Sequence, residues 1–292
     1  MGFWQKNQQL EATVLHRKVR NTVMSLLLLS AITSAIGTSP VQAARSLTEQ
    51  LHAPPQASLR QQRDVADEFL LLGQEHLSLG NYDSAIIALQ EAATAYHYLG
   101  DFVGMGEAYE QLVKVYSSLG RYREAEQVVR QQLAIARSNQ NFSDQILSLN
   151  NLGTIHLQAG DIETAHAAFL EGLSVSQDIE SDSGIGLSLS NLGLISVAQG
   201  QLNDARKYYE VAVDYRVRAR DYAGASNTDS NLGDVYLASG QVRSAIGAYR
   251  VALSVARNID DPYLQLLALD GLITIYRDRN EPAELSNYIN VR

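Results

Sequence analysis

Three asparagines at a constant spacing carry the most informative side-chain chemistry in this sequence. They are Asn151, Asn191 and Asn231. A carboxamide both donates and accepts hydrogen bonds, so it can pair with the N–H and the C=O of a peptide backbone. Asn is a mediocre residue for a helix interior, about 0.5 kcal/mol worse than Ala, so its repetition needs a reason. The pattern predicts binding of an extended chain rather than catalysis.

Residues near these asparagines complete the set of candidate peptide-binding positions. They are Asn150, Thr154, Leu187, Leu194, Asn227 and Asp234. Apolar side chains between the amides favour a ligand with small or apolar side chains over a strongly charged one. Recent duplication would also copy the three asparagines. Against duplication alone, the next position on the same helical face has diverged to Thr154, Leu194 and Asp234.

Motifs for catalysis, cofactor binding and metal binding do not occur in the sequence. The chain has no Cys, which excludes disulfides, thiolate nucleophiles and cysteine-based metal sites. It has no HExxH motif, no phosphate-binding loop and no nucleophile elbow. His76 and His156 fall at the position that Tyr116 and Tyr236 occupy in other repeats, so we expect both to pack between helices. We therefore expect no enzymatic activity, no cofactor and no metal.

A basic stretch between Arg206 and Arg220 is the one local feature that suggests nucleic acid. Tyrosines are interleaved with its Arg and Lys residues, a combination that can stack on single strands. Acidic residues dilute it, however, and the chain has a net charge of −9, or −12 without residues 1–43. Nucleic-acid-binding proteins need a basic footprint. We expect a solvated face or a second protein contact here, and no nucleic-acid partner.

The asparagines belong to a repeat that organises most of the chain. A glycine recurs at a fixed interval, in the series Gly80, Gly120, Gly160, Gly200 and Gly240, and Asn280 takes the next place. Around each glycine, apolar residues follow helical spacing rather than alternation. A fixed period of this length is typical of a solenoid, in which each repeat packs on its neighbours and offers an extended surface.

Residues at the boundaries predict two helices per repeat. The recurring glycine suits the left-handed position that ends a helix. Each following repeat opens with a residue that can cap a helix N-terminus: Asp101, Asn141, Ser181, Asp221 and Asp261. Pro262 suits a first helical turn, whereas Pro282 interrupts the last repeat, whose second helix should be short. Close approach of the two helices is favoured by small residues, namely Gly153, Gly193, Gly233, Ala165, Ala205 and Ala245.

This pattern resembles the tetratricopeptide repeat family, in a 40-residue variant similar to the arrays of kinesin light chain. The match is clear over residues 231–249, where Leu-Gly follows the Asn, Gly stands at the turn, and Ala and an aromatic follow. The resemblance implies an all-α, right-handed superhelical solenoid of about six helix-turn-helix repeats over residues 64–292. It also implies that Asn151, Asn191 and Asn231 face a concave groove and bond the main chain of an extended ligand.

The N-terminal segment has the pattern of a secretory signal peptide. Residues 1–43 have four basic residues near the start, an apolar stretch from Val23 to Ile36, and small residues before a cleavage site. Residues 44–63 contain Pro54-Pro55 and are predicted to be a linker. We expect an exported protein in the periplasm or an equivalent compartment, with secretion as the alternative. An uncleaved signal would give the only expected membrane contact.

Together these features predict an exported scaffold that binds another protein through an extended peptide segment, for assembly or adaptor work. Two alternatives remain open from the residues alone. One is a structural solenoid that associates with itself. The other is a peptide-sensing regulator of the same repeat type.

Overall fold

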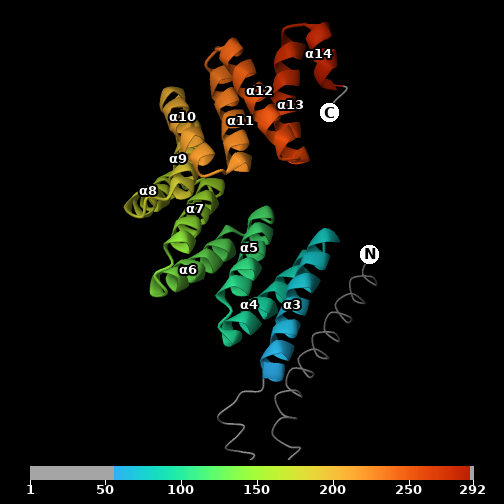
Figure 1. Cartoon of the computed structure of the whole chain (residues 1–292), viewed down its shortest axis with the longest axis vertical. Coiled ribbons are helices and arrows are strands. Elements are labelled where there is room, and N and C mark those ends of the chain that lie inside the picture. Colours follow the sequence, from blue (N-terminus) through green and yellow to red (C-terminus); the bar gives the residue numbers. More distant parts are fainter. Residues whose placement is uncertain (1–55, 290–292) are drawn as a thin grey trace, which may run out of the picture. The chain divides into compact units, whose positions relative to one another are not determined.

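The computed structural model describes residues 56–289, and α-helix is the only regular secondary structure in that range (Figure 1). Twelve helices, α3 to α14, are described. The signal peptide predicted for residues 1–43 lies outside the described residues. Helix α3, Gln56–Ser78, begins inside the predicted linker at 44–63, so helical structure starts earlier than expected. No helix between residues 56 and 289 combines the length and the apolar character needed to cross a bilayer.

The chain divides into two compact units, Met1–Val115 and Tyr116–Arg292, with the boundary inside α5. In the first unit, α3 and α4 (Tyr82–Leu99) pack against each other, and α5 spans Phe102–Ser118. Tyr96 in α4 donates its hydroxyl hydrogen to Asp67 in α3. These contacts make the first unit a helical stack of its own.

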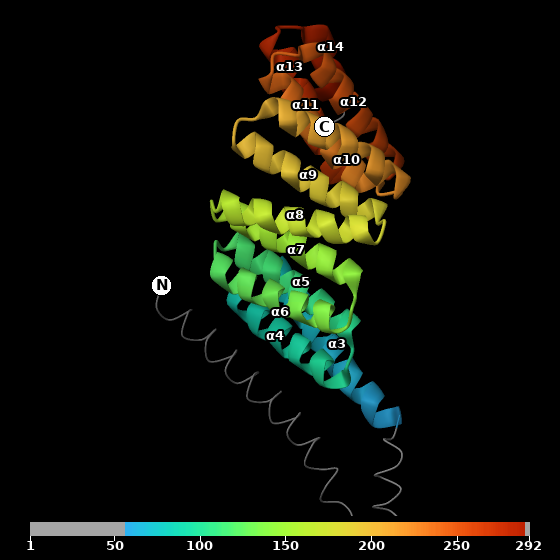
Figure 2. The same ribbon diagram turned by 90° about the vertical axis from the view of Figure 1, so that its left-hand side faces the viewer.

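The second unit repeats one pair of helices. The first helix of each pair is named the A helix and the second the B helix, and from α7 to α14 they follow one another in chain order (Figure 2). The bounds are α6 Tyr122–Ser138, α7 Phe142–Gln158, α8 Ile162–Asp178, α9 Asp182–Ala198, α10 Leu202–Arg218, α11 Tyr222–Ala238, α12 Val242–Asn258, α13 Pro262–Asp278 and α14 Pro282–Ile289. The predicted all-α solenoid of helix pairs is confirmed.

Capping side chains start the A helices as the sequence predicts. Asp101, Asn141, Ser181, Asp221 and Asp261 each accept a hydrogen bond from a backbone N–H in the first helical turn, at 2.9–3.2 Å. Each bond satisfies a donor that the helix leaves free and contributes about 1 kcal/mol. Pro262 stands in the first turn of α13, also as predicted. The repeat boundaries are therefore fixed locally.

Turns recur twice as often as the glycine period indicates. The predicted A-to-B turns have a left-handed residue at each glycine from Gly80 to Gly240, and at Asn280. Turns from B to the next A have the same left-handed backbone at Gly100, but from there on at non-glycine residues, namely Gln140, Glu180, Arg220 and Asp260. The second set has no common residue type, so the sequence period alone does not reveal it.

Aromatic side chains of the B helices fill the space left by glycines of the A helices. A Cβ atom at Gly233 would lie 2.7 Å from the Tyr249 ring, and one at Gly153 would be closer still to Phe169. Gly193 faces Tyr209 in the same way. These three rings are at most 2% exposed. The predicted close approach of the two helices is confirmed, and each buried ring contributes about 1.5–3 kcal/mol.

Within the second unit the A helices lie against one another. Helix α7 contacts α9, α9 contacts α11, and α11 contacts α13. The B helices α8, α10 and α12 make no contacts of comparable extent with one another among the described residues. Because neighbouring A helices approach more closely than neighbouring B helices, the surface of this unit curves toward the A helices. The A side is therefore the inner side.

The last described helix, α14, begins at Pro282, which stands in its first turn and does not interrupt the repeat, contrary to the expectation from the sequence. Within the described residues α14 covers Pro282–Ile289. Arg250 in α12 donates to the hydroxyls of Tyr276 at 3.0 Å and Tyr288 at 3.2 Å. The rings of Tyr276 and Tyr288 are stacked, with centroids 5.6 Å apart. These contacts hold α14 against α12 and α13.

Candidate functional site

The partly exposed surface of the A helices is the candidate site. Three positions per helix, at i, i+4 and i+7, form what we call the A-helix face: Leu147, Asn151, Thr154, Leu187, Asn191, Leu194, Asn227, Asn231 and Asp234. The three repeated asparagines are partly buried, and Asn227, Leu194 and Asp234 are exposed. Because α7, α9 and α11 lie side by side, this face runs across three repeats. The sequence candidates other than Asn150 all belong to it.

Asn150 differs from the sequence prediction. Its side chain is 2% exposed and lies between helices, so it cannot meet a ligand in this conformation. Its Nδ2 donates to the backbone carbonyl of Ile146 at 2.8 Å and to Ser188 Oγ at 3.0 Å. Its Oδ1 accepts a hydrogen bond from Asn191 Nδ2 at 2.9 Å. Asn150 therefore orients Asn191 instead of contacting a partner directly.

The three repeated asparagines consequently differ in which hydrogen-bonding groups remain available to a ligand. Asn191 is tied to Asn150, which leaves its Oδ1 as the group available to a ligand N–H. Asn151 and Asn231 make no such side-chain bond within the described residues, so both donor and acceptor remain available there. Thr154 is committed to its own helix, because its Oγ1 donates to the Asn150 carbonyl at 2.9 Å. The A-helix face can therefore both donate to and accept from a main chain.

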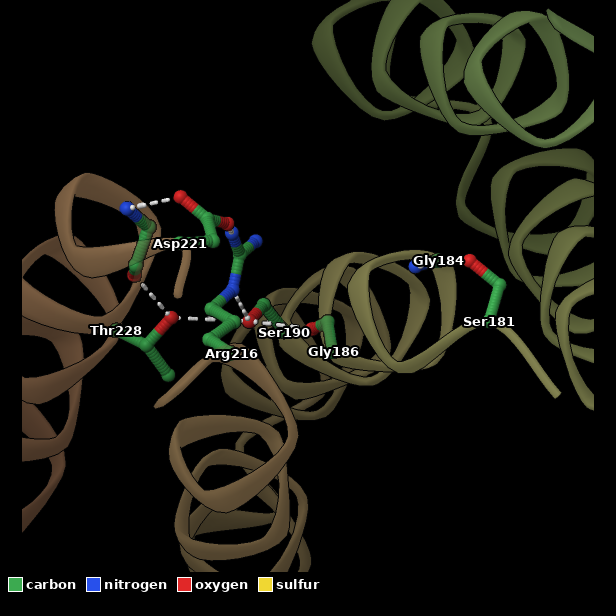
Figure 3. A network of polar contacts seen from close by, with 8 residues as sticks. Ser181, Gly184, Gly186, Ser190, Arg216, Asp221 and Thr228 are labelled. Atoms are coloured by element: carbon green, nitrogen blue, oxygen red, sulfur yellow. Dashed lines mark hydrogen bonds and ion pairs between the residues drawn. The ribbon is translucent and has the colours of Figure 1, made fainter. Parts of the chain in front are cut away.

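A buried polar network lies next to this face and was not foreseen (Figure 3). Arg216 of α10 donates from Nε to Ser190 Oγ in α9 at 3.0 Å and pairs with Asp221, the cap of α11. Ser190 also shares a hydrogen bond with Thr228 Oγ1 of α11 at 3.0 Å. The network thus joins three successive helices. Its hydrogen bonds and its ion pair link α9 to α11 through Arg216, and we infer that the network fixes the spacing of these two helices.

Arg216 corrects one part of the sequence interpretation. The stretch from Arg206 to Arg220 was expected to be a solvated face, yet Arg216 is only 8% exposed. Two glycines make room for its side chain, since a Cβ at Gly186 would lie 2.8 Å from Arg216 Cγ and one at Gly224 would overlap the guanidinium. Counterparts of Arg216 carry no charge: they are Tyr96, Ala136, Ser176 and Ala256. That contrast was the signal available in the sequence.

Two tyrosines end at the A-helix face in different ways. Tyr249 of α12 passes Gly233 and donates its hydroxyl hydrogen to Asp234 Oδ1. Tyr209 is the equivalent residue one repeat earlier, but its buried hydroxyl has no hydrogen-bond partner among the described residues. Burial is the main cause that raises the pKa of both phenols, and the Asp234 carboxylate adds to it. Both hydroxyls are therefore neutral donors.

Histidines offer little additional chemistry. His156 Nδ1 is 3.5 Å from Asp161 Oδ2 and its Nε2 is 3.6 Å from Glu126 Oε1. His76 and His156 are both partly buried, in keeping with the predicted packing between helices. Within residues 56–289 no group of three or more metal-ligating side chains comes together. The A-helix face, with its amides and one carboxylate, remains the candidate site.

Fold and face together define an α-helical repeat protein with an extended, open surface of hydrogen-bonding groups. Two family models, each described as tetratricopeptide repeat, match the sequence. One covers residues 104–178 and 184–258, and the other covers residues 69–97. The chain belongs to the tetratricopeptide repeat family, as its resemblance indicated.

Individual proteins are similar to parts of this chain in sequence or in structure. Tetratricopeptide repeat protein 29 of Macaca fascicularis is 31% identical over 98 residues, which cover 34% of this chain and 21% of that protein. The chain thus spans about a fifth of the length of this curated relative. The crystal structure of BtubC (BKLC) from P. vanneervenii is 23% identical, with a TM-score of 0.55, over 75% of this chain and 88% of that one.

A further similar structure contains a bound peptide. The Rap conjugation gene regulator of the plasmid pLS20, in complex with the Phr* peptide, is 19% identical to this chain. Its TM-score is 0.60, and the match covers 76% of this chain and 61% of that one. At this level of identity the likeness shows a shared fold.

Proposed function

We propose that this chain is a scaffold that binds another protein through an extended peptide segment lying along the A-helix face. The observation that supports it most is the set of three partly exposed carboxamides, Asn151, Asn191 and Asn231, on helices that lie side by side. Packed helices are about 8–10 Å apart, and an extended peptide advances about 3.3 Å per residue. One asparagine would therefore meet roughly every third residue of the ligand.

The strength of such binding follows from the number of bonds. Each hydrogen bond contributes about 0.5–1.5 kcal/mol net, so three asparagines give a modest affinity unless side-chain contacts add to it. Leu147, Leu187 and Leu194 lie between the amides and offer apolar contact. A ligand with small or apolar side chains at these points fits best. The Phr* peptide complex of a protein with a similar fold supports a peptide as the class of ligand.

The proposed setting is outside the cytoplasm. The support is the signal-peptide pattern of residues 1–43, and the compartment is the periplasm or its equivalent. There the protein would serve assembly or adaptor work on other exported or membrane proteins. Neither an enzymatic step nor a cofactor enters the proposal.

Capture of partners tests the proposal. The purified protein and the triple variant Asn151→Ala, Asn191→Ala, Asn231→Ala are immobilised after circular dichroism has shown equal helicity. Both are incubated with envelope extract of the source cells, and retained proteins are identified by mass spectrometry. We expect a partner that the parent retains and the triple variant loses. A partner retained equally by both would place the contact elsewhere on the protein.

A further inference from the structure

The A helices of the second unit are almost free of basic residues. Among the described residues, Arg277 in the last turn of α13 is the only Lys or Arg in α7, α9, α11 and α13. The same helices carry six acidic residues: Asp144, Asp182, Asp229, Asp234, Asp270 and Asp278. Asp182 and Asp278 pair with Arg218 and Arg277, and Asp229 is buried, so an attraction for cationic groups of a ligand falls to the remaining surface acids.

Asp234 is the acidic residue of the A-helix face, at the end of the face that α11 forms. It is exposed on α11, at position i+3 from Asn231 and therefore on the same side of the helix. Among the described residues its carboxylate forms no ion pair with a Lys, Arg or His side chain. Its known contact is the hydrogen bond accepted from Tyr249. A second oxygen and the negative charge remain available to a ligand.

Tyr209 lies near enough to Asp234 for that carboxylate to add to the effect of burial, which raises the pKa of the phenol. It is 1% exposed, and its hydroxyl has no partner among the described residues, although a buried hydroxyl without one costs about 1–3 kcal/mol. Tyr209 packs on Gly193 as Tyr249 packs on Gly233. Its hydroxyl is closed off from solvent, so it does not reach a ligand in this conformation.

We propose that Asp234 binds a basic side chain, Lys or Arg, of the extended segment. This inference rests on the proposed function and adds a charge preference at one position. The flanking leucines still select small or apolar side chains, so the ligand carries its positive charge at the level of α11. A carboxylate paired with Lys or Arg forms charge-assisted hydrogen bonds, which are stronger than those of the asparagines.

A library of random peptides tests this preference directly. Phage-displayed random dodecapeptides are selected at neutral pH on the immobilised full chain. Selection is repeated on Asp234→Asn, which keeps an acceptor for Tyr249, and on the triple asparagine variant. The control is Asp214→Asn, which removes the same charge from the exposed surface of α10. A selected peptide is then synthesised with a fluorophore and its Kd is measured by anisotropy.

Expected results are specific to one ligand position. Peptides selected on the parent should share a Lys or Arg at one register, and Asp234→Asn should weaken binding about tenfold. Replacing that basic residue by Gln should weaken binding to the parent equally, and should have no further effect with Asp234→Asn. Asp214→Asn should bind as the parent does.

Two failures can be told apart. Selected peptides that depend on the asparagines but show no basic residue, with unchanged Kd for Asp234→Asn, would overturn the charge preference and leave the proposed function standing. A library that yields no peptide, or only peptides that the triple variant binds equally, would overturn both.

Discussion

Asn191 is held in place by Asn150, whose Oδ1 accepts a hydrogen bond from Asn191 Nδ2 at 2.9 Å. One asparagine is buried in the helix packing and the other is partly exposed on the A-helix face. The buried residue therefore acts through the exposed one. Asn191 thus has the proposed role of contacting the ligand, and Asn150 has the role of orienting Asn191. The sequence alone does not distinguish these roles, because the residue next to each repeated position can be of the same type.

The asparagines should differ in their effect on stability. Asn191→Ala removes the partner of a buried oxygen and should lower the free energy of unfolding by about 1 kcal/mol. Asn151→Ala and Asn231→Ala remove no comparable side-chain hydrogen bond. The better helix propensity of Ala should therefore leave the stability of these two variants unchanged or raise it by about 0.5 kcal/mol. Urea unfolding followed by circular dichroism measures all three. Equal destabilisation by the three variants would contradict the role given to Asn150.

The Arg216–Asp221 pair should matter more than an exposed pair on the same helix. Arg216→Ala removes a buried guanidinium from contact with Ser190 and Asp221, and we expect a loss of about 2–4 kcal/mol. The matched control is Arg218→Ala, whose exposed pair with Asp182 should contribute less than about 1 kcal/mol. Unfolding free energies in urea distinguish the two. A loss of similar size in both variants would show that the buried network does not fix α9 and α11.

Asp229 should make stability depend on pH. Its side chain is 7% exposed, and burial raises the pKa of its carboxyl to about 6, whereas an unfolded Asp titrates near about 3.9. The folded state therefore binds the proton more tightly. The stabilisation is complete below about pH 4 and is lost as the pH rises through about 6, with a difference of about 2–3 kcal/mol.

Asp229→Asn tests this dependence. The variant should be more stable than the parent at pH 7.5, and it should lack the fall in stability between about pH 4 and 6. Chemical unfolding is measured at several pH values in this range and at pH 7.5. The exposed Asp214→Asn serves as the control and should follow the parent. If the unfolding free energy of Asp229→Asn fell with pH as steeply as that of the parent, the pH dependence would belong to other groups.

Replacing a left-handed residue of a B-to-A turn by glycine should increase the stability of the protein. Gln140 has a φ of 53°, a conformation in which a side chain costs about 1–2 kcal/mol. Gln140→Gly should therefore stabilise the protein by about 0.5–1 kcal/mol, once the greater entropy of glycine in the unfolded chain is counted. The reverse change, Gly160→Ala at a φ of 83°, should destabilise by about 1 kcal/mol. Thermal unfolding would contradict this account if Gln140→Gly lowered the midpoint.

Sequence reasoning predicted the regular parts of the structure because each rests on local chemistry. Capping residues such as Asp261, the left-handed glycines and the Gly233–Tyr249 contact repeat with the period, so a single alignment of the chain on itself reveals them. The left-handed residues of the B-to-A turns were not predicted, because Gln140 and its counterparts differ in residue type. The start of α3 escaped because Pro54-Pro55 suggested a linker.

The site was predictable only in part. Spacing placed Asn151, Asn191 and Asn231 on one face, but a shift of one position on a helix turns a side chain by about 100°, which buried Asn150. Arg216 was misread because a local run of charge does not show which member points inward. That the Tyr209 hydroxyl lacks the kind of partner that Tyr249 has can be recognised only in the three-dimensional structure.

The central claim, that the three repeated carboxamides bind the main chain of a partner, is tested most directly by calorimetry. A synthetic peptide corresponding to the captured segment is titrated into the parent, the triple variant and Asn203→Ala, an exposed asparagine of α10 that serves as the control. We expect the triple variant to bind about tenfold to a thousandfold more weakly, and the control to match the parent. Equal dissociation constants for the parent and the triple variant would contradict the account.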